Sequence, residues 1–310
     1  MKQVFIKKGK ALIDTVPGPI ASDDEVLVQV GYSCISAGTE MAGIEASGKP
    51  LYKKAMDKPD QIRKVLESIR TSGLKDTIAK VQSKVEAKNP IGYSASGVVL
   101  ETGKNIKSFK PGDRVACAGA GIANHAEFIT VPENLMVRVP DELSLKDAST
   151  VTLGSIAMQG VRRCNPGLGE NITVIGLGIL GQLTVQMLKA SGCKVIGIDI
   201  DQSRIDKALS LGLDIGLNPG KTEIVSEVAR NTDGYGSDSV IITAASKSSI
   251  VINEAMEMCR RKGKVIIVGA VNLSLEREEF YKKELDLLIS TSYGPGRYDE
   301  RYEKKGFDYP

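Results

Sequence analysis

Three glycines at Gly-x-Gly-x-x-Gly spacing give this chain its clearest chemical signature. Gly176, Gly178 and Gly181 follow the apolar run 172–175 and precede an apolar helical stretch around 183–188. In this setting the first glycine permits a tight turn, the second lets the backbone approach a pyrophosphate, and the third lets helix and strand pack closely. The helix N-terminus offers unpaired N–H groups and a positive dipole end to the phosphates. The intervening residues of the predicted dinucleotide-binding turn are Leu177, Ile179 and Leu180. The competing interpretation is a glycine-rich turn in some other α/β protein.

An acid after the next apolar run indicates which dinucleotide is bound. Asp199 ends the run 194–199, and a carboxylate there accepts hydrogen bonds from a ribose diol but repels a 2′-phosphate. This predicts NAD. Arg204, five residues further on, keeps NADP open as the alternative, and a solvated helix charge is its plainer interpretation. Further along the chain, the residues expected at the carboxyl edge of the sheet beside the nicotinamide are Ala244, Val268 and Gly269.

The elements that position these residues alternate between strand and helix from about residue 150 onward. Strands are expected at 172–175, 194–200, 213–216, 239–243, 264–268 and 286–290. Helices centred near 185, 207, 226 and 255 lie between the first five. This alternation predicts a doubly wound parallel sheet with right-handed crossovers.

The first half of the chain has a different texture. Residues 1–48 and 89–140 contain β-branched runs separated by turn pairs, which predicts strands and turns in a small β-barrel-like domain. Residues 49–88 interrupt it with two predicted helices carrying eleven Lys or Arg against five Asp or Glu. A solvated face on packed helices is one interpretation of that charge, and a surface for a partner or an anionic substrate is the other.

Composition narrows the class of protein. The chain has 310 residues, 42% hydrophobic and 25% charged, with a net charge of +3. This suits two packed domains, and the charge is too balanced to indicate nucleic acid or a membrane surface as a partner. The five cysteines are widely spaced without a Cys-x-x-Cys pair, which favours free thiols in a reducing compartment. The first residues lack the apolar core of a signal peptide, so a cytoplasmic enzyme is expected.

Several local motifs make the chain resemble the medium-chain dehydrogenase/reductase superfamily, the alcohol-dehydrogenase-like enzymes. The motifs are Gly112–Val115, Ala126–Pro132, the turn at Gly176, and Val268–Gly269. The resemblance implies α/β architecture, with a GroES-like β-barrel catalytic domain over 1–149 and a Rossmann domain over 150–290. The narrower motifs Ser36–Glu40, Gly92–Ser94, Ala123–Glu127 and Ser292–Asp299 resemble a branch that lacks the zinc site. In that branch the module is the N-terminal half of a bi-domain oxidoreductase, whose other half is similar to glucose–fructose oxidoreductases. On this resemblance, residues 291–310 are expected to begin a longer closing segment, and a partner oxidoreductase domain would follow.

The same resemblance bears on zinc. Relatives hold catalytic zinc with Cys, His and Cys. At the corresponding positions this chain has Ser36, Tyr93, and Gly154 or Ser155. A serine hydroxyl, a phenol and a glycine are poor zinc ligands at neutral pH, so no metal is expected.

Without zinc, organic side chains must polarise the substrate oxygen and carry its proton. The candidates that the resemblance places in the vacated pocket are Tyr93, His125, Ser36, Thr39 and Glu40. His125, the only histidine, suits general acid–base chemistry near neutral pH, and packing in place of an aromatic residue is its alternative role. Tyr93 is expected to donate to a developing alkoxide, or else to be a barrel tyrosine. Thr39 and Glu40 are expected to position these groups or a ribose.

The sequence therefore predicts a zinc-independent, NAD-dependent oxidoreductase acting on a small-molecule alcohol or carbonyl, sugar-type if the partner domain is a guide. An NADPH-dependent enoyl or quinone reductase is one alternative, and a cofactor-binding half without turnover is another. The resemblance also implies a homodimer.

Overall fold

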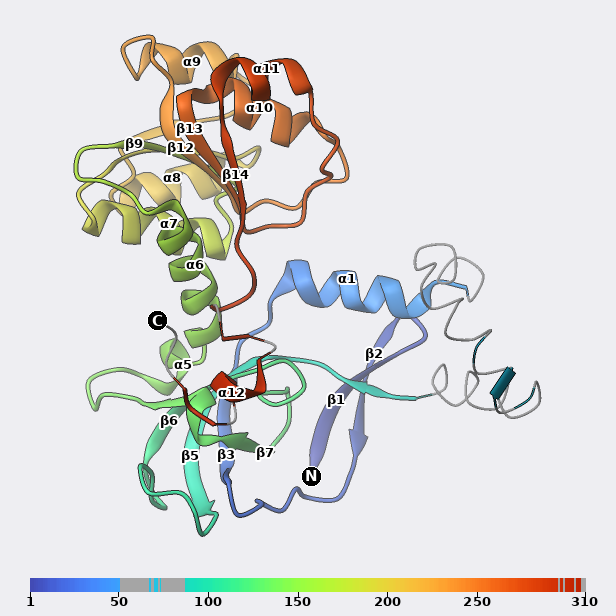
Figure 1. Cartoon of the computed structure of the whole chain (residues 1–310). Coiled ribbons are helices and arrows are strands. Elements are labelled where there is room, and N and C mark those ends of the chain that lie inside the picture. The colour runs from blue at the N-terminus through green and yellow to red at the C-terminus, as the bar shows by residue number, and fades with distance from the viewer. Residues whose placement is uncertain are drawn as a thin grey trace. The chain divides into compact units, whose positions relative to one another are not determined.

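The computed structural model describes residues 1–50, 67, 70, 71, 73, 87–294, 296, 297, 299–303 and 305–307. These residues form two compact units, Met1–Thr152 and Leu153–Pro310, which are drawn in Figure 1. The helices predicted within 49–88 lie outside the described residues, apart from isolated positions.

Unit 1 is built from two antiparallel sheets. The three-stranded sheet has the order β2-β1-β4, and the five-stranded sheet has the order β7-β3-β5-β6-β8. An isolated bridge between Gln3 and Ala126 links the first sheet to the turn before β7. The strands are β1 (Lys2–Lys7), β2 (Lys10–Thr15), β3 (Glu25–Ser33), β4 (Asn89–Pro90), β5 (Ser94–Thr102), β6 (Arg114–Ala118), β7 (Phe128–Pro132) and β8 (Met136–Arg138).

Within residues 1–50 and 87–150, three helical segments accompany the strands, and one of them corrects the sequence prediction. Strands and turns were expected throughout 1–48, but Ala37–Gly48 forms the helix α1. Its small residues lack the β-branched alternation of a strand. The side chain of Glu40, in its first turn, accepts a hydrogen bond from the backbone N–H of Ser36, which satisfies a donor at the helix start. The other two segments are the 3₁₀ turn Glu133–Leu135 and α5 (Leu145–Ala148).

Unit 2 contains a six-stranded sheet in which every pairing is parallel. Its strand order is β11-β10-β9-β12-β13-β14, so the chain starts in the middle, winds to one edge, returns and winds to the other. This confirms the predicted doubly wound topology. The strands are β9 (Asn171–Ile175), β10 (Lys194–Ile198), β11 (Ile215–Leu217), β12 (Ser237–Ile242), β13 (Cys259–Ile267) and β14 (Asp286–Ile289).

Each face of this sheet is covered by its own hydrophobic core. Alternate side chains along a strand point to opposite faces, so Val174 joins one core while Ile175 joins the other. The helices are α6 (Val151–Cys164), α7 (Ile179–Ala190), α8 (Gln202–Ser210), α9 (Ile224–Arg230), α10 (Ile250–Met258), α11 (Arg277–Lys283) and α12 (Glu300–Glu303). One core contains side chains of α6, α7 and α8, and the other contains those of α9 and α10.

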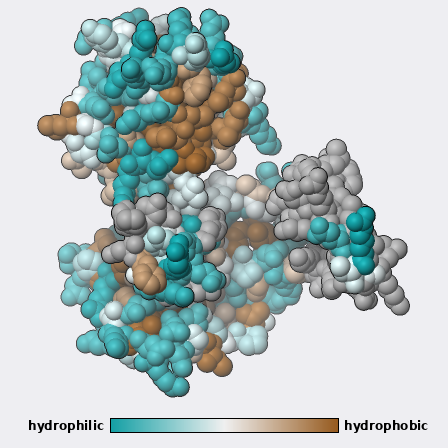
Figure 2. Space-filling model, in the orientation of Figure 1, coloured by the Kyte–Doolittle hydropathy of each residue, from teal (hydrophilic) through white to brown (hydrophobic). Residues whose placement is uncertain are grey.

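The surface of unit 2 has an apolar area, seen in brown in Figure 2. Exposed apolar side chains of unit 2 include Ile250, Leu273 and Ile289, the last on the edge strand β14. Among the described residues, no helix combines the length and apolarity needed to cross a lipid bilayer.

Candidate cofactor site and acid–base cluster

The turn between β9 and α7 has the shape that its glycines predict. Gly176 has φ +92°, in the left-handed region, and a Cβ there would lie 2.7 Å from the Cβ of Ala244. A Cβ on Gly181 would overlap the carbonyl oxygen of Gly176 and lie 2.9 Å from its carbonyl carbon. At Gly178 a Cβ would meet nothing within 4 Å. The first and third glycines are therefore demanded by packing, whereas the second borders open space at the start of α7.

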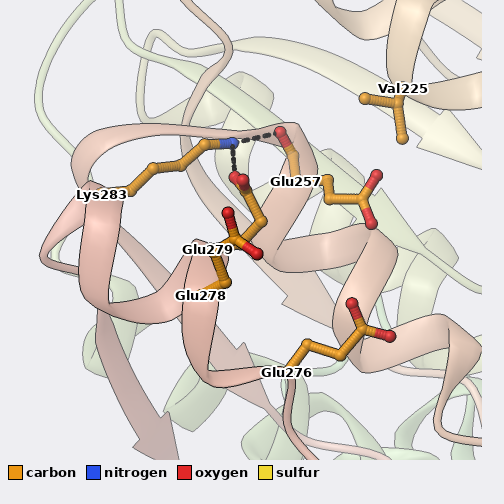
Figure 3. A pocket seen from close by; sticks show the side chains of 6 residues that line it. All are labelled: Val225, Glu257, Glu276, Glu278, Glu279 and Lys283. Atoms are coloured by element: carbon orange, nitrogen blue, oxygen red, sulfur yellow. Dashed lines mark hydrogen bonds and ion pairs between the residues drawn. The ribbon is translucent and has the colours of Figure 1, made fainter.

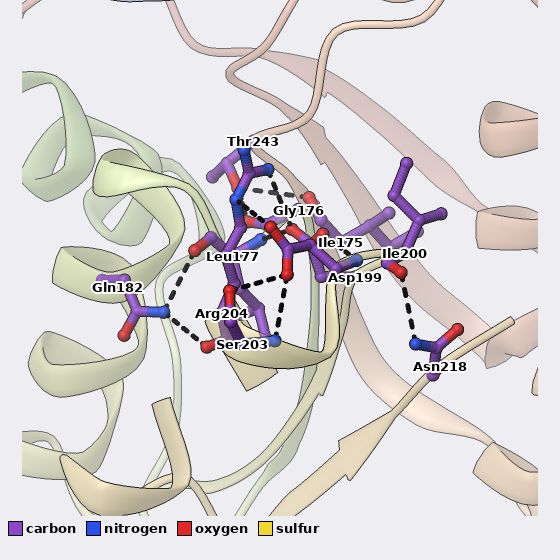
Figure 4. Close-up of polar contacts among 11 residues, drawn as sticks. Ile175, Gly176, Leu177, Gln182, Asp199, Ile200, Ser203, Arg204, Asn218 and Thr243 are labelled. Atoms are coloured by element: carbon purple, nitrogen blue, oxygen red, sulfur yellow. Dashed lines mark hydrogen bonds and ion pairs between the residues drawn. The ribbon is translucent and has the colours of Figure 1, made fainter. Parts of the chain in front are cut away.

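Residues that directly follow β12 and β13 lie at the same end of the sheet, and Thr243 contacts this turn. The Thr243 hydroxyl donates to the carbonyl oxygens of Ile175 (3.1 Å) and Gly176 (2.5 Å), as drawn in Figure 4. The backbone N–H groups of Val268 and Gly269 both donate to the Ile242 carbonyl, at 2.9 and 2.8 Å. The structure thus brings Val268 and Gly269 to the carboxyl edge of the sheet.

Asp199 is buried and held by two backbone donors (Figure 4). Its Oδ2 accepts a hydrogen bond from the Leu177 N–H at 2.7 Å, and its Oδ1 accepts one from the Asp201 N–H at 2.8 Å. The Leu177 amide therefore serves the acid, and the Leu177 side chain is packed in the core. The carboxylate that sequence reasoning assigned to the ribose is fixed in one orientation.

Arg204 lies beside this acid without being committed to it. Its Nη1 is 3.6 Å from Asp199 Oδ2, its Nε is 3.5 Å from Asp201 Oδ2, and its side chain is 54% exposed. Because the arginine side chain is largely exposed, water screens these contacts and they contribute little to stability. The guanidinium is therefore available to a ligand at this edge.

The acid–base candidates of unit 1 form a second cluster, around His125. Its Nε2 lies 3.1 and 3.2 Å from the two carboxylate oxygens of Glu40, and its Nδ1 lies 2.8 Å from the Ser33 hydroxyl. The side chains of His125 and Glu40 are only 10% and 8% exposed. Glu40 in turn accepts the Ser36 N–H at 2.9 Å. Three of the five predicted residues, His125, Glu40 and Ser36, are thus linked.

The backbone around His125 is fitted closely to it. Its N–H donates to the Ile91 carbonyl at 2.9 Å, and its carbonyl accepts from the Val4 N–H at 2.8 Å. Gly92, at φ +104°, makes room for His125, since a Cβ at this glycine would lie 2.7 Å from the backbone nitrogen of His125 and 3.0 Å from its Cγ. The imidazole is therefore held through both its backbone and its ring.

Tyr93 and Thr39 are not joined to this cluster by any side-chain hydrogen bond in the part of the chain described. Tyr93 contributes its backbone carbonyl, which accepts from the Gly119 N–H and from the Thr152 hydroxyl, both at 3.0 Å. Thr39 is exposed on the first turn of α1. Sequence reasoning missed Ser33, because one hydroxyl at the end of a strand carries no distinctive spacing.

The pKa of the Cys34 thiol is affected by burial and by Glu40 of the same cluster. Partial burial raises the pKa of its thiol, and the neighbouring Glu40 carboxylate raises it further. At neutral pH this thiol is therefore protonated, a weak metal ligand and a poor nucleophile.

The residues at the expected zinc positions do not fit a catalytic zinc. Ser36 offers a hydroxyl and Tyr93 a phenol, while the third position offers no side chain at Gly154 or a second hydroxyl at Ser155. None of these gives zinc the thiolate and imidazole ligands of relatives. Across the described residues, no three His, Cys, Asp or Glu side chains gather as a metal-binding group.

A separate hollow in unit 2 lies among the helices α9, α10 and α11 (Figure 3). Its rim is acidic, and Lys283 is tied to the Glu257 carbonyl at 2.6 Å and to the Glu279 carboxylate at 3.3 Å. None of the predicted site residues lines it. Its acidic rim repels the phosphates of a dinucleotide, which makes this hollow a poor cofactor site.

Two family models match parts of the chain. A family model described as an alcohol dehydrogenase GroES-like domain matches residues 62–141, and one described as a zinc-binding dehydrogenase matches residues 180–304. An uncharacterised zinc-type alcohol dehydrogenase-like protein of Escherichia coli (strain K12) is 24% identical over 335 residues, covering 96% of this chain and 86% of the relative.

Solved structures share the fold. The 2R,3R-butanediol dehydrogenase of Bacillus subtilis aligns with a TM-score of 0.74 at 21% identity, over 95% of this chain and 85% of that one. The quinone oxidoreductase of Escherichia coli, solved with NADPH, aligns with a TM-score of 0.72 at 15% identity, over 94% and 83%. These likenesses confirm the predicted fold class, a GroES-like domain followed by a parallel-sheet Rossmann domain. The two family matches support membership of the alcohol-dehydrogenase-like superfamily of medium-chain dehydrogenases/reductases, and the chain is an NAD(P)-dependent oxidoreductase.

Proposed function

We propose that this protein is a zinc-independent, NAD-dependent oxidoreductase that interconverts a small alcohol and its carbonyl compound. The observation that carries the proposal is the pairing of an open Gly178 with a fixed Asp199 at the mouth of the β9–α7 turn. The first leaves room for a diphosphate against the backbone, and the second presents a carboxylate to a ribose diol.

Different residues around the β9–α7 turn hold different parts of the cofactor. The start of α7 faces the diphosphate, Asp199 accepts the ribose hydroxyls, and Leu177 acts through Asp199 by keeping its carboxylate oriented. Ala244, Val268 and Gly269 border the nicotinamide end at the carboxyl edge of the sheet. When bound, the nicotinamide supplies or accepts the hydride.

Proton transfer is assigned to His125 with Glu40. Alcohol oxidation releases a proton and carbonyl reduction consumes one, so a buried imidazole beside a carboxylate suits either direction. Glu40 is anchored by the Ser36 N–H, so Ser36 takes a positioning role. Tyr93 and Thr39 remain candidates for contact with the substrate, without an observed link to the proton path.

Independence from zinc is supported by the side chains at Ser36 and Tyr93, which lack metal-binding character. Sugar-type carbonyls are one substrate class within this proposal, suggested by the resemblance to bi-domain oxidoreductases. An NADPH-dependent enoyl or quinone reductase is the competing function, and the exposed Arg204 beside Asp199 favours it.

Cofactor titration tests the proposal. We expect NADH to bind at least about tenfold more tightly than NADPH, a difference of about 1.4 kcal/mol, as measured by fluorescence. Asp199→Asn removes the charge and should narrow this preference, while Arg204→Gln, the matched control, should leave NADH binding nearly unchanged. A preference for NADPH in the unaltered protein would favour the reductase. The absence of any nucleotide binding would refute the cofactor site.

Metal dependence is tested on the same preparation. After dialysis against a chelator, activity on a panel of alcohols, aldehydes and sugars should persist, and elemental analysis should find zinc well below one ion per chain. Activity that disappears on dialysis and returns with zinc would contradict the proposal.

The outer edge of the unit 2 sheet supports a homodimer. β14 is the terminal strand in the sheet order, and it exposes Ile289. An edge strand with unpaired backbone groups and apolar side chains favours pairing with another chain. Light scattering should give twice the mass of one chain, and Ile289→Lys should lower the measured mass toward that of a single chain.

A further inference from the structure

His125 has one polar partner on each ring nitrogen, and the two partners differ in kind. Glu40 is a carboxylate that is anchored by the Ser36 N–H, whereas Ser33 is a hydroxyl at the end of β3. We propose that Ser33, His125 and Glu40 form a proton relay in which the Ser33 hydroxyl meets the substrate oxygen. This inference rests on the proposed function and adds to it the group that exchanges the proton with substrate.

The hydrogen bonds fix the direction of the relay. An ionised carboxylate only accepts hydrogen bonds, so the Nε2 that faces both oxygens of Glu40 must carry a hydrogen. In the neutral imidazole the other nitrogen, Nδ1, is then an acceptor, and the Ser33 hydroxyl 2.8 Å away donates to it. The serine proton thus already points at a base.

Burial shows where the relay opens. His125 and Glu40 are about nine-tenths buried, while Ser33 is partly exposed. A substrate oxygen therefore reaches Ser33 more readily than the imidazole. Neighbouring Cys34 stays a neutral thiol, because burial and Glu40 raise its pKa. The negative charge that compensates an imidazolium in this cluster is therefore that of Glu40.

The proton steps balance without a further reactant. During alcohol oxidation the substrate O–H bond breaks and its proton joins Ser33 Oγ, while the original Ser33 proton moves to His125 Nδ1. His125 becomes an imidazolium, and the negative charge of Glu40 compensates its positive charge inside the buried cluster. Carbonyl reduction runs the same two transfers backwards. The hydride moves separately, to or from the nicotinamide of the proposed function.

The single histidine allows a direct test. The chain contains one histidine, so protein labelled with ¹⁵N-histidine and carrying no histidine tag yields one pair of ring nitrogen signals. In the neutral form we expect a protonated Nε2 and an unprotonated, hydrogen-bonded Nδ1. Ser33→Ala should shift the Nδ1 signal, Ser33→Thr should restore it, and Ser108→Ala, at an exposed serine of the same unit, should leave it unchanged.

Kinetics then separate the relay from a structural role. Ser33→Ala should lower kcat by roughly 10- to 100-fold, within the range of general acid–base effects, with little change in NADH binding. Ser33→Thr should recover most of the rate. A hydrogen on Nδ1 in the neutral form, or an unchanged kcat in Ser33→Ala, would overturn the relay while leaving the oxidoreductase proposal intact. If the unaltered protein binds no NADH, the proposed function fails independently of the nitrogen signals.

Discussion

Replacing Gly178 or Gly181 by alanine separates a glycine needed for ligand approach from one needed for packing. At Gly178 the φ of −67° is ordinary for alanine and the added Cβ has no neighbour within 4 Å. At Gly181 the Cβ would lie 2.9 Å from the Gly176 carbonyl carbon and 3.1 Å from Thr243 Oγ1, and closer still to the Gly176 oxygen. The same chemical change therefore meets open space in one case and backbone in the other.

The expected magnitudes differ accordingly. Gly178→Ala should change the free energy of unfolding by no more than about 0.5 kcal/mol, as a substitution without a structural clash does. Gly181→Ala forces α7 away from β9 and should cost about 1–3 kcal/mol through overpacking. In a unit of this size that lowers the melting temperature by roughly 2–4 °C for each kcal/mol. Cofactor affinity should fall at least about tenfold in Gly178→Ala, because the methyl group occupies the space of the diphosphate.

Thermal unfolding and NADH fluorescence titration on both variants measure these effects. The pattern expected is unchanged stability with weak binding for Gly178→Ala, and reduced stability for Gly181→Ala. If Gly178→Ala binds NADH as tightly as the unaltered protein, the diphosphate does not approach this turn and the reasoning is refuted. Equal melting temperatures for Gly181→Ala and the unaltered protein would contradict the packing argument.

Two further outcomes follow from the cluster in unit 1. Gly92→Ala should displace His125 and lower kcat far more than NADH affinity, measured by steady-state kinetics and titration, because a Cβ there would crowd the imidazole in a left-handed backbone conformation. Equal losses in both would count against this. At fixed pH, Glu40→Gln should speed alkylation of Cys34, since removing the negative charge lowers the pKa of the thiol and increases the thiolate; mass spectrometry of the labelled protein follows the rate. The buried thiols of Cys117 and Cys259, with pKa values raised by burial to about 12, should stay unlabelled until unfolding, and early labelling of either would show the packing to be looser.

The cofactor domain could be predicted from sequence because its signals are local. Each strand is a short apolar run, each crossover is a helix, and the turn chemistry depends on glycines a few residues apart. Even so, the boundaries moved: the strand expected to reach 200 ends at Ile198, so Asp199 and Ile200 lie beyond it. The close approach of Gly181 to the Gly176 carbonyl is what makes the spacing of these glycines informative.

The acid–base cluster could be predicted only in part, because its contacts are remote in sequence. Ser33 and His125 are 92 residues apart, and Glu40 and His125 are 85 apart. No periodicity connects such positions, so the pairing depends on how β3, α1 and the turn before β7 pack. The helix α1 was missed for a different reason, because its small residues show no apolar periodicity, although the contact of Glu40 with the Ser36 N–H is local.

The way Asp199 is held has a consequence for redesigning the nucleotide preference. Its carboxylate satisfies the N–H groups of Leu177 and Asp201, so exchanging it for a small neutral residue would strand two amide hydrogens in a buried place. A 2′-phosphate could itself accept those hydrogens while Arg204 balances its charge. A variant converted to bind NADP would then have these hydrogen bonds satisfied while the nucleotide is bound. Without the nucleotide, the variant would be less stable than the unaltered protein.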